Sequence, residues 1–334
     1  MKVQRNQSKL KLRPMALLLV IAVVLILPQV IKSTYFMLVL CLCGIYTIAT
    51  AGLDINFGYA GQISLGHAAF YAIGAYGSAI LSKLAGINPW ITMLLASAFA
   101  AVVGFLFALP ISKLKFMFLS LVTTGFGEIV YQIIVNFWPD ITGSTSGFKG
   151  IPKLGIAGFV FKDRHDYAYI VIFCTILFLL AKYCIVNSRI GRAFIAIRES
   201  AEAAGAMGIN VTYYKAMSFS ISAFYTAFAG ALYGHMVGFI SPETFKRPQS
   251  IMLLTMALLG GRGTMLGPVF GSLILVVLTE SVQMFGQYQQ LIYGFFIIIV
   301  VLFMPGGLAG VLASAKAAAQ NLRIGGNADA VGDQ

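Results

Sequence analysis

Ten runs of apolar residues divide most of the chain, and they constrain its fold more than any other feature of the sequence. A helix needs about 20 apolar residues to cross ~30 Å of hydrocarbon at a rise of 1.5 Å per residue. Several runs approach this length, whereas 249–260 is too short and is expected to be a half-helix or to continue through the glycines after it. The runs cover residues 15–31, 35–53, 63–82, 90–110, 116–137, 167–184, 216–240, 249–260, 266–285 and 287–304.

Composition indicates which solvent surrounds these runs. Of the 334 residues, 59% are hydrophobic and 10% are charged, whereas a soluble domain has roughly 25% charged residues. A surface with so few charges would not stay dissolved in water, so most of the chain must lie in lipid. We therefore predict an all-α polytopic membrane protein with about ten transmembrane helices.

Lysine and arginine set the expected orientation. The net charge of +12 would suit a nucleic-acid partner, but basic residues also mark the cytoplasmic side of membrane proteins. If the basic segment 1–14 lies inside and ten spans follow, 15 of the 23 basic residues lie inside, Lys182 among them. Both termini are then cytoplasmic, and no nucleic acid is needed. Residues 311–334 are small and polar, and we expect a flexible cytoplasmic tail there.

Reactive side chains are sparse. The four cysteines lie within or beside apolar runs and are expected to pack there rather than to form disulfides. The three histidines are far apart in the sequence and lack the spacing of metal ligands. The sequence has no hydrolase or nucleotide-binding motif. We expect a non-catalytic chain without metal or cofactor, so any nucleotide that drives it must be bound by another chain.

Closely spaced glycines interrupt two apolar stretches, 57–74 and 259–271. Corresponding glycine-broken segments in the two halves of a transporter are typical of inverted repeats, with broken helices around a central pathway. We therefore expect inverted repeats and two broken helices in this chain. The expected break glycines are Gly61, Gly66, Gly261, Gly263 and Gly267.

Four polar residues within these runs are candidates for lining a pathway. Gln62, Ser64 and His67 lie beside the first glycine break, where tight helix packing is the alternative interpretation. Glu128 lies inside the run at 116–137, and a buried carboxylate in lipid is costly unless it serves a function. The alternative for Glu128 is a structural contact with a hydroxyl group or another span.

Two segments between the runs are long. Residues 138–166 are rich in turn formers and are expected to form an external segment. Residues 185–215 are expected on the cytoplasmic side. In this inner segment Arg198 and Glu202 are four residues apart, so one helical face would hold both.

A short helix is expected within the inner segment. Ser200 would cap its start, with Glu202 in the first turn, and Gly205 and Gly208 would end it early. A helix of one or two turns is unstable alone in water. It therefore needs a scaffold or a partner's groove, or else it is an ordinary solvated loop helix.

The residues from Glu202 to Gly208 resemble the EAA-x3-G loop of ABC importer permeases, although the leucine-proline ending of the fuller form is absent near Tyr213. Longer stretches, in order along residues 35–310, resemble the permease family of branched-chain amino acid ABC importers, in particular its LivM-like branch. These stretches are GLDINFGYAGQISLGHAAFYAIGAY (52–76), FGEI (126–129), TGSTSGFKGIP (142–152), SRIGRAFIAIRESAEAAGAMGI (188–209), LGGRGTMLGPVFG (259–271) and MPGGLAG (304–310).

We expect a transmembrane permease domain over 15–310, and the resemblance, which covers 35–310, implies that it lies in the inner (plasma) membrane of a bacterium. Its expected partners are a second homologous permease in a heterodimer, two cytoplasmic ATP-binding subunits and a periplasmic or extracellular solute-binding protein. The loop 185–215 would be the coupling loop that docks on the ATPases. Its implied docking residues are Arg198, Glu199, Ser200, Glu202, Ala203, Ala204, Gly205 and Gly208.

The substrate implied by the resemblance is leucine, isoleucine or valine. Importers of urea or short-chain amides belong to the same family branch and are the nearest alternative. An autonomous channel or a secondary transporter is an alternative of a different class, and it would work without an ATPase.

Overall fold

The computed structural model describes residues 33–282, apart from 113, 115, 138, 157–158 and 162–163, and also positions 286, 288, 291–292, 294–296, 298 and 307. The predicted run at 15–31, most of the run at 287–304, and the segments 1–14 and 311–334 lie outside the described residues.

Four described helices are long and apolar enough to cross a membrane. They correspond to the predicted runs 35–53, 90–110, 116–137 and 167–184, and only four two-residue strands occur in the described part of the chain. The prediction of a polytopic all-α membrane protein is confirmed. The four helices are α2 (Thr34–Asp54) with the π-helical turn η1 (Ile55–Tyr59), α4 (Pro89–Ile111), α5 (Phe116–Gln132) with η2 (Ile133–Phe137), and α7 (Arg164–Asn187).

Helix α10 (Val211–Val237) lies at the centre of the bundle, packed most extensively against α2, α4 and α3 (His67–Leu84). The backbones of α3 and α10 touch directly. A methyl group on Gly74 would overlap the carbonyl of Ala227, and one on Gly230 would overlap the carbonyl of Tyr71. Small residues at helix crossings allow this approach in membranes, so these glycines fix the distance between the two helices.

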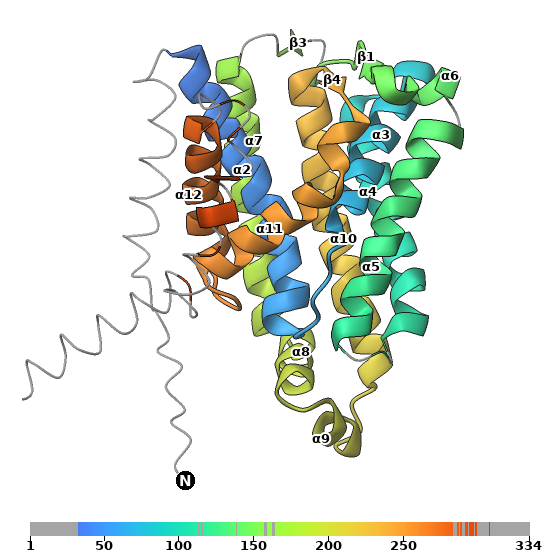
Figure 1. The fold of residues 1–334 in the computed structure, drawn as a ribbon, viewed down its shortest axis with the longest axis vertical. Coiled ribbons are helices and arrows are strands. Elements are labelled where there is room, and N and C mark those ends of the chain that lie inside the picture. The colour runs from blue at the N-terminus through green and yellow to red at the C-terminus, as the bar shows by residue number, and fades with distance from the viewer. Residues whose placement is uncertain are drawn as a thin grey trace, which may run out of the picture.

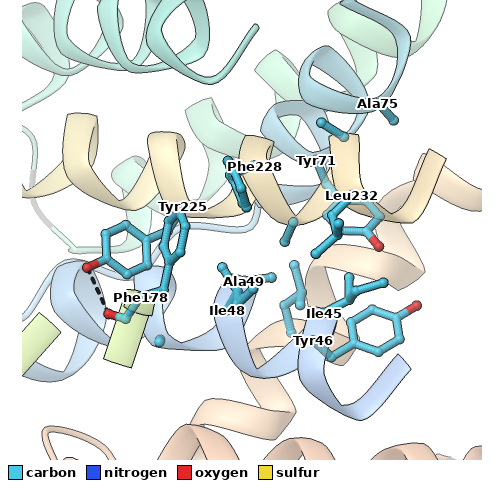
Figure 2. Packing of buried hydrophobic residues seen from close by; sticks show 14 of the residues in the cluster. Ile45, Tyr46, Ile48, Ala49, Tyr71, Ala75, Phe178, Tyr225, Phe228 and Leu232 are labelled. Atoms are coloured by element: carbon cyan, nitrogen blue, oxygen red, sulfur yellow. Dashed lines mark hydrogen bonds between the residues drawn. The ribbon is translucent and has the colours of Figure 1, made fainter. Parts of the chain in front are cut away.

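Figure 2 shows the packed layer where α2, α7 and α10 meet. Ile48 of α2 and Phe228 of α10 belong to one buried cluster. Tyr225 of α10 donates a hydrogen bond from its hydroxyl to the carbonyl of Phe178 in α7, at 3.1 Å. Burying a tyrosine hydroxyl without a partner costs free energy, so this bond favours a large aromatic side chain in the layer.

Short elements occupy the two ends of the bundle (Figure 1). Helices α8 (Arg189–Glu199) and α9 (Ala201–Ala206) project beyond the long helices at one end, and the strands lie at the opposite end. The predicted inner and outer segments therefore lie at opposite ends. The outer elements are α6 (Pro139–Thr142), η3 (Ser144–Ser146), β1 (Phe148–Lys149), paired antiparallel with β4 (Phe239–Ile240), β2 (Gly155–Ile156), paired antiparallel with β3 (Phe159–Val160), and η4 (Pro242–Phe245).

Helix breaks lie at both glycine-rich stretches. Residues 61–66 are not helical, so α3 begins at His67 rather than at the start of the predicted run. Helix α11 (Arg247–Gly260) has 14 residues and is about 21 Å long. It ends where Gly261 takes a φ of 102°, and α12 (Gly267–Val282) starts after the loop. The run at 249–260 is therefore a half-helix that does not continue through the glycines.

Candidate coupling loop and translocation face

Helix α8 is the anchored part of the candidate coupling loop, residues 185–215. The hydroxyl of Ser188 accepts hydrogen bonds from the backbone N–H groups of Ile190 and Gly191, at 3.1 and 3.4 Å, and thereby caps the helix start. One face of the helix is buried, including Phe194 and Ile197, and the other is polar. This amphipathic pattern holds α8 against the end of the bundle.

Helix α9 is capped at both ends by the residues expected to do so. The hydroxyl of Ser200 accepts from the N–H of Ala203 at 3.2 Å, and Glu202 lies in the first turn. At the other end Gly208 has a φ of 84°. The N–H of Gly208 donates to the carbonyl oxygen of Gly205, and the N–H of Ile209 donates to the carbonyl oxygen of Ala204. This is the Schellman ending. Gly205 itself lies within α9, so Gly208 alone ends the helix.

The surface of α9 consists mostly of alanine and glycine, and the helix projects from the bundle (Figure 1). Ala204 is buried, whereas Glu202, Ala203 and Gly205 are exposed. Met207 follows with 85% of its surface exposed. Apolar side chains and exposed backbone gather here without cover from the described residues, as on a surface that a partner covers.

Arg198 is not positioned as expected. Ser200 interrupts the helix with a φ of −159°, so Arg198 and Glu202 lie on different helices and do not share a face. Arg198 instead pairs with Glu199 at 2.8 Å and donates from Nη1 to the carbonyl oxygen of Gly58 at 2.7 Å. The candidate coupling loop is thus hydrogen-bonded to η1, the π-helical turn that continues α2.

A buried ion pair lies next to this contact and includes Asp54, four residues before Gly58. Lys182 of α7 donates from Nζ to Asp54 Oδ2 at 2.8 Å, and both side chains are almost fully buried. Asp54 Oδ1 accepts from the N–H of Gly263 at 2.7 Å, and Lys182 also donates to the carbonyl of Thr264 at 3.0 Å. The interpretation of Lys182 as a cation in an inner loop is therefore wrong, because this ammonium group lies inside the protein.

The two glycine-rich stretches meet at this ion pair. A methyl group on Gly58 would overlap both Asp54 Oδ1 and the backbone nitrogen of Gly263. A methyl group on Gly263 would lie 3.1 Å from the Gly58 carbonyl oxygen and 3.2 Å from Arg198 Nη1. The helix break after α2, the break after α11 and the coupling loop therefore share one set of contacts.

Three candidate pathway residues are buried against α10. Gln62 Nε2 lies 2.8 Å from Ser218 Oγ and 3.0 Å from the carbonyl of Lys215. His67 Nε2 lies 2.6 Å from Ser222 Oγ, and its Nδ1 lies 3.1 Å from Ser64 Oγ. Each side chain thus has hydrogen-bond partners within the protein. These contacts hold the start of α3 against α10, as the interpretation of tight helix packing expects. A role for Gln62, Ser64 and His67 in lining the pathway stays a prediction.

Glu128 lies within the candidate membrane span 118–137, as expected, and its side chain is not covered by the described residues. It begins a row of polar side chains along α5 and η2, spaced four residues apart. Gln132 donates to Glu128 Oε1 at 3.3 Å, and Asn136 donates to Gln132 Oε1 at 2.6 Å, and all three are exposed. Polar side chains on a membrane helix face a partner or a water-filled cavity rather than lipid. This row makes the exposed side of α5 a candidate translocation face.

Comparison with known proteins places the chain among transport proteins. The family described as branched-chain amino acid transport system / permease component matches residues 35–304. The chain belongs to this permease family. As such, it is similar to the high-affinity branched-chain amino acid transport system permease protein LivM of Salmonella typhimurium, with 33% identity over 79% of this chain and 67% of the relative.

The match covers most of the length of two further relatives of this chain. The permease is 29% identical to the permease protein BraD of Pseudomonas aeruginosa, over 79% of this chain and 91% of the relative. It is 26% identical to the permease protein LivH of Salmonella typhimurium, over the same shares. Both names describe high-affinity branched-chain amino acid transport systems. No solved structure was found to match the chain.

Sequence reasoning found some parts of this site and missed others. The caps of α9 and the glycine breaks follow from local rules. The contact between Arg198 and Gly58 and the ion pair between Asp54 and Lys182 were missed. A weak signal was present, because Lys182 lies near the end of an apolar run and Asp54 precedes a glycine-rich break. A cation and an anion at such positions are candidates for a buried pair.

Proposed function

We propose that this chain is a permease subunit of an ABC importer that carries branched-chain amino acids across the inner membrane of a bacterium. The membership of the family over residues 35–304 carries this proposal. The chain itself is non-catalytic, and ATP is hydrolysed by two cytoplasmic partner subunits. Residues 15–310 form the permease domain, and both termini and the coupling loop lie in the cytoplasm.

A second, homologous permease completes the pathway in this proposal. LivM and LivH are both similar to this chain, and both are named as permeases of such systems. Two related permeases in one importer would therefore form a heterodimer. The exposed row of Glu128, Gln132 and Asn136 supports placing the translocation pathway along α5, where the second subunit would shield it from lipid.

The coupling loop is proposed to receive the ATPases. The exposed surface of α9 supports docking, because alanine and glycine leave the helix free of bulky side chains that a partner's groove would have to accommodate. Closure of the ATPases would move α9 together with α8. Arg198 would pass this movement to Gly58 and hence to both helix breaks. A periplasmic solute-binding protein would deliver the substrate at the opposite end, near 138–166.

Reconstitution of the complete importer tests the transport function. We expect ATP-driven uptake of leucine into proteoliposomes when the second permease, the ATPases and the leucine-loaded binding protein are present. Uptake of urea without uptake of leucine would contradict the substrate, and ATP-independent uptake by this chain alone would contradict the ABC assignment.

Docking is tested separately by variants of α9. Ala203 is exposed, so Ala203→Trp places bulk on the proposed contact surface without filling the interior. Ala204 is 3% exposed, and a tryptophan there would disturb α9 itself. We expect Ala203→Trp and Glu202→Lys to abolish co-purification of the ATPases while the permease stays folded. Tyr183→Trp, on the exposed surface of α7, is the matched control. Unchanged co-purification and transport in both α9 variants would contradict docking at this surface.

A further inference from the structure

A groove of about 510 Å³ lies beside Glu128 on the proposed translocation face. Its walls come from α5, from the residues that begin α3, and from the connection between η4 and α11. Pockets for small molecules commonly measure roughly 300–1,000 Å³. The groove is therefore large enough for an amino acid.

The groove has charged side chains of two kinds, namely a pair that compensates itself and two that have no opposite charge among the described residues. Lys246 forms an ion pair with Glu243 at 2.6 Å, and Glu243 also accepts a hydrogen bond from the hydroxyl of Tyr131 at 3.0 Å. The hydrogen bond from Lys246 holds the pKa of Glu243 below its usual range, so this carboxylate stays ionised. These two charges compensate each other.

Arg247 and Glu128 are left without an opposite charge. Both line the groove. Among the described residues, Arg247 makes no ion pair or hydrogen bond, and Glu128 meets no cation but only the amide group of Gln132 at 3.3 Å. The groove thus presents one available cation and one available anion.

The rest of the lining is mostly apolar. Leu65, Leu121 and Phe245 supply apolar surface, while Gly125 and Gly127 leave space along α5. A ligand that matches this lining has an ammonium group, a carboxylate group and an aliphatic side chain. An aliphatic amino acid in its zwitterionic form has all three.

We propose that this groove is a binding site for the zwitterion of an aliphatic amino acid, in which Glu128 contacts the ammonium group and Arg247 the carboxylate. The inference rests on the proposed function and adds residues that recognise the substrate inside the permease. Arginine suits this role because its planar group forms two parallel hydrogen bonds to a carboxylate. Neutral urea or amide substrates would not use these charges.

Charge-neutralising variants in the reconstituted importer test this site. We expect Glu128→Gln and Arg247→Gln each to lower ATP-driven leucine uptake by about tenfold, since an ionic contact contributes at least the ~1.4 kcal/mol that corresponds to a tenfold change. Binding of the ATPases should stay unchanged. The charge-conserving variants Glu128→Asp and Arg247→Lys should retain more uptake than the neutral ones. Glu280→Gln removes a carboxylate from α12 outside the groove and should leave uptake unchanged.

The lipid composition of the vesicles separates substrate from lipid. Phosphatidylethanolamine headgroups also combine an ammonium group with an anion, and so the assays are run in vesicles with and without this lipid. A defect that persists without it supports an amino-acid site, whereas a defect seen only with it overturns the proposal.

Two results distinguish failure of this site from failure of the function. Leucine uptake at the unaltered rate in both neutral variants overturns the binding site but leaves the transport function intact. Uptake of urea but no amino acid by the unaltered importer overturns the transport function and this inference together.

Discussion

Arg198 Nη1 lies 2.7 Å from the carbonyl oxygen of Gly58, and this hydrogen bond joins the proposed coupling loop to η1, the turn that continues α2. The end of α2 meets the loop after α11, because the N–H of Gly263 bonds to Asp54 at 2.7 Å. A displacement of α8 would therefore be transmitted through these contacts to both helix breaks. The route consists of two hydrogen bonds that involve charged side chains, those of Arg198 and Asp54, together with the backbone between Asp54 and Gly58.

Replacement of Arg198 should weaken transport more than docking. A hydrogen bond to a charged group contributes about 1.5–3 kcal/mol, so Arg198→Gln should lower leucine uptake per ATP hydrolysed by roughly tenfold or more. The ATPases should still bind, because α9 keeps its caps. The measurement is uptake and phosphate release in the same reconstituted vesicles.

Arg192 provides the matched control on the same helix. Its side chain is exposed and, among the residues that the structure describes, donates only to the carbonyl of Asn187, at 3.4 Å. Arg192→Gln should keep the ratio of uptake to hydrolysis. Equal ratios for Arg198→Gln and the unaltered protein would contradict a coupling role for the contact with Gly58.

Asp54 and Lys182 should stabilise the fold only as a pair. Removal of one partner leaves a buried charge without compensation and typically costs about 3–5 kcal/mol, whereas removal of both is often nearly neutral. We expect Asp54→Asn and Lys182→Met each to lower the thermal unfolding temperature of the purified permease in detergent.

The double variant Asp54→Asn/Lys182→Met should recover most of that loss. The Asp54→Asn change keeps a side-chain oxygen that can accept the hydrogen bond from Gly263, so the loop after α11 stays attached. Additive losses in the double variant would show that the two side chains do not depend on each other.

These contacts also show how far the sequence predicts the molecule. The cap at Ser200 and the helix end at Gly208 depend on neighbours within a few residues, so local rules predict both. Asp54 and Lys182 are 128 positions apart, and no pattern in either run indicates their pairing. Arg198 was assigned to the wrong partner because the i,i+4 rule assumes a continuous helix, which Ser200 interrupts. Hydropathy places Glu128 within a span but does not indicate which face of that span meets a partner.

Gly74 should tolerate no side chain. A methyl group there would overlap the carbonyl of Ala227, which belongs to the backbone of α10 and cannot rotate away. Overpacking of this kind typically costs about 1–3 kcal/mol, so Gly74→Ala should lower the thermal unfolding temperature. Gly125→Ala is the control, because a methyl group on that glycine meets nothing within 4 Å. Equal unfolding temperatures for both variants would contradict direct backbone contact between α3 and α10.

Loss of the cap at Ser200 should unfold α9 locally. The helix has six residues and buries only Ala204, so little tertiary packing supports it. An N-cap contributes about 1 kcal/mol, and Ser200→Ala should therefore raise amide hydrogen exchange in 201–207 by roughly fivefold. ATPase affinity should fall by a similar factor, because docking requires the folded helix. Ser188→Ala removes the cap of α8, which Phe194 and Ile197 anchor in the bundle, and it should change exchange in α8 less. Exchange in 201–207 that is unaffected by Ser200→Ala would show that the bundle, rather than the cap, holds α9 in place.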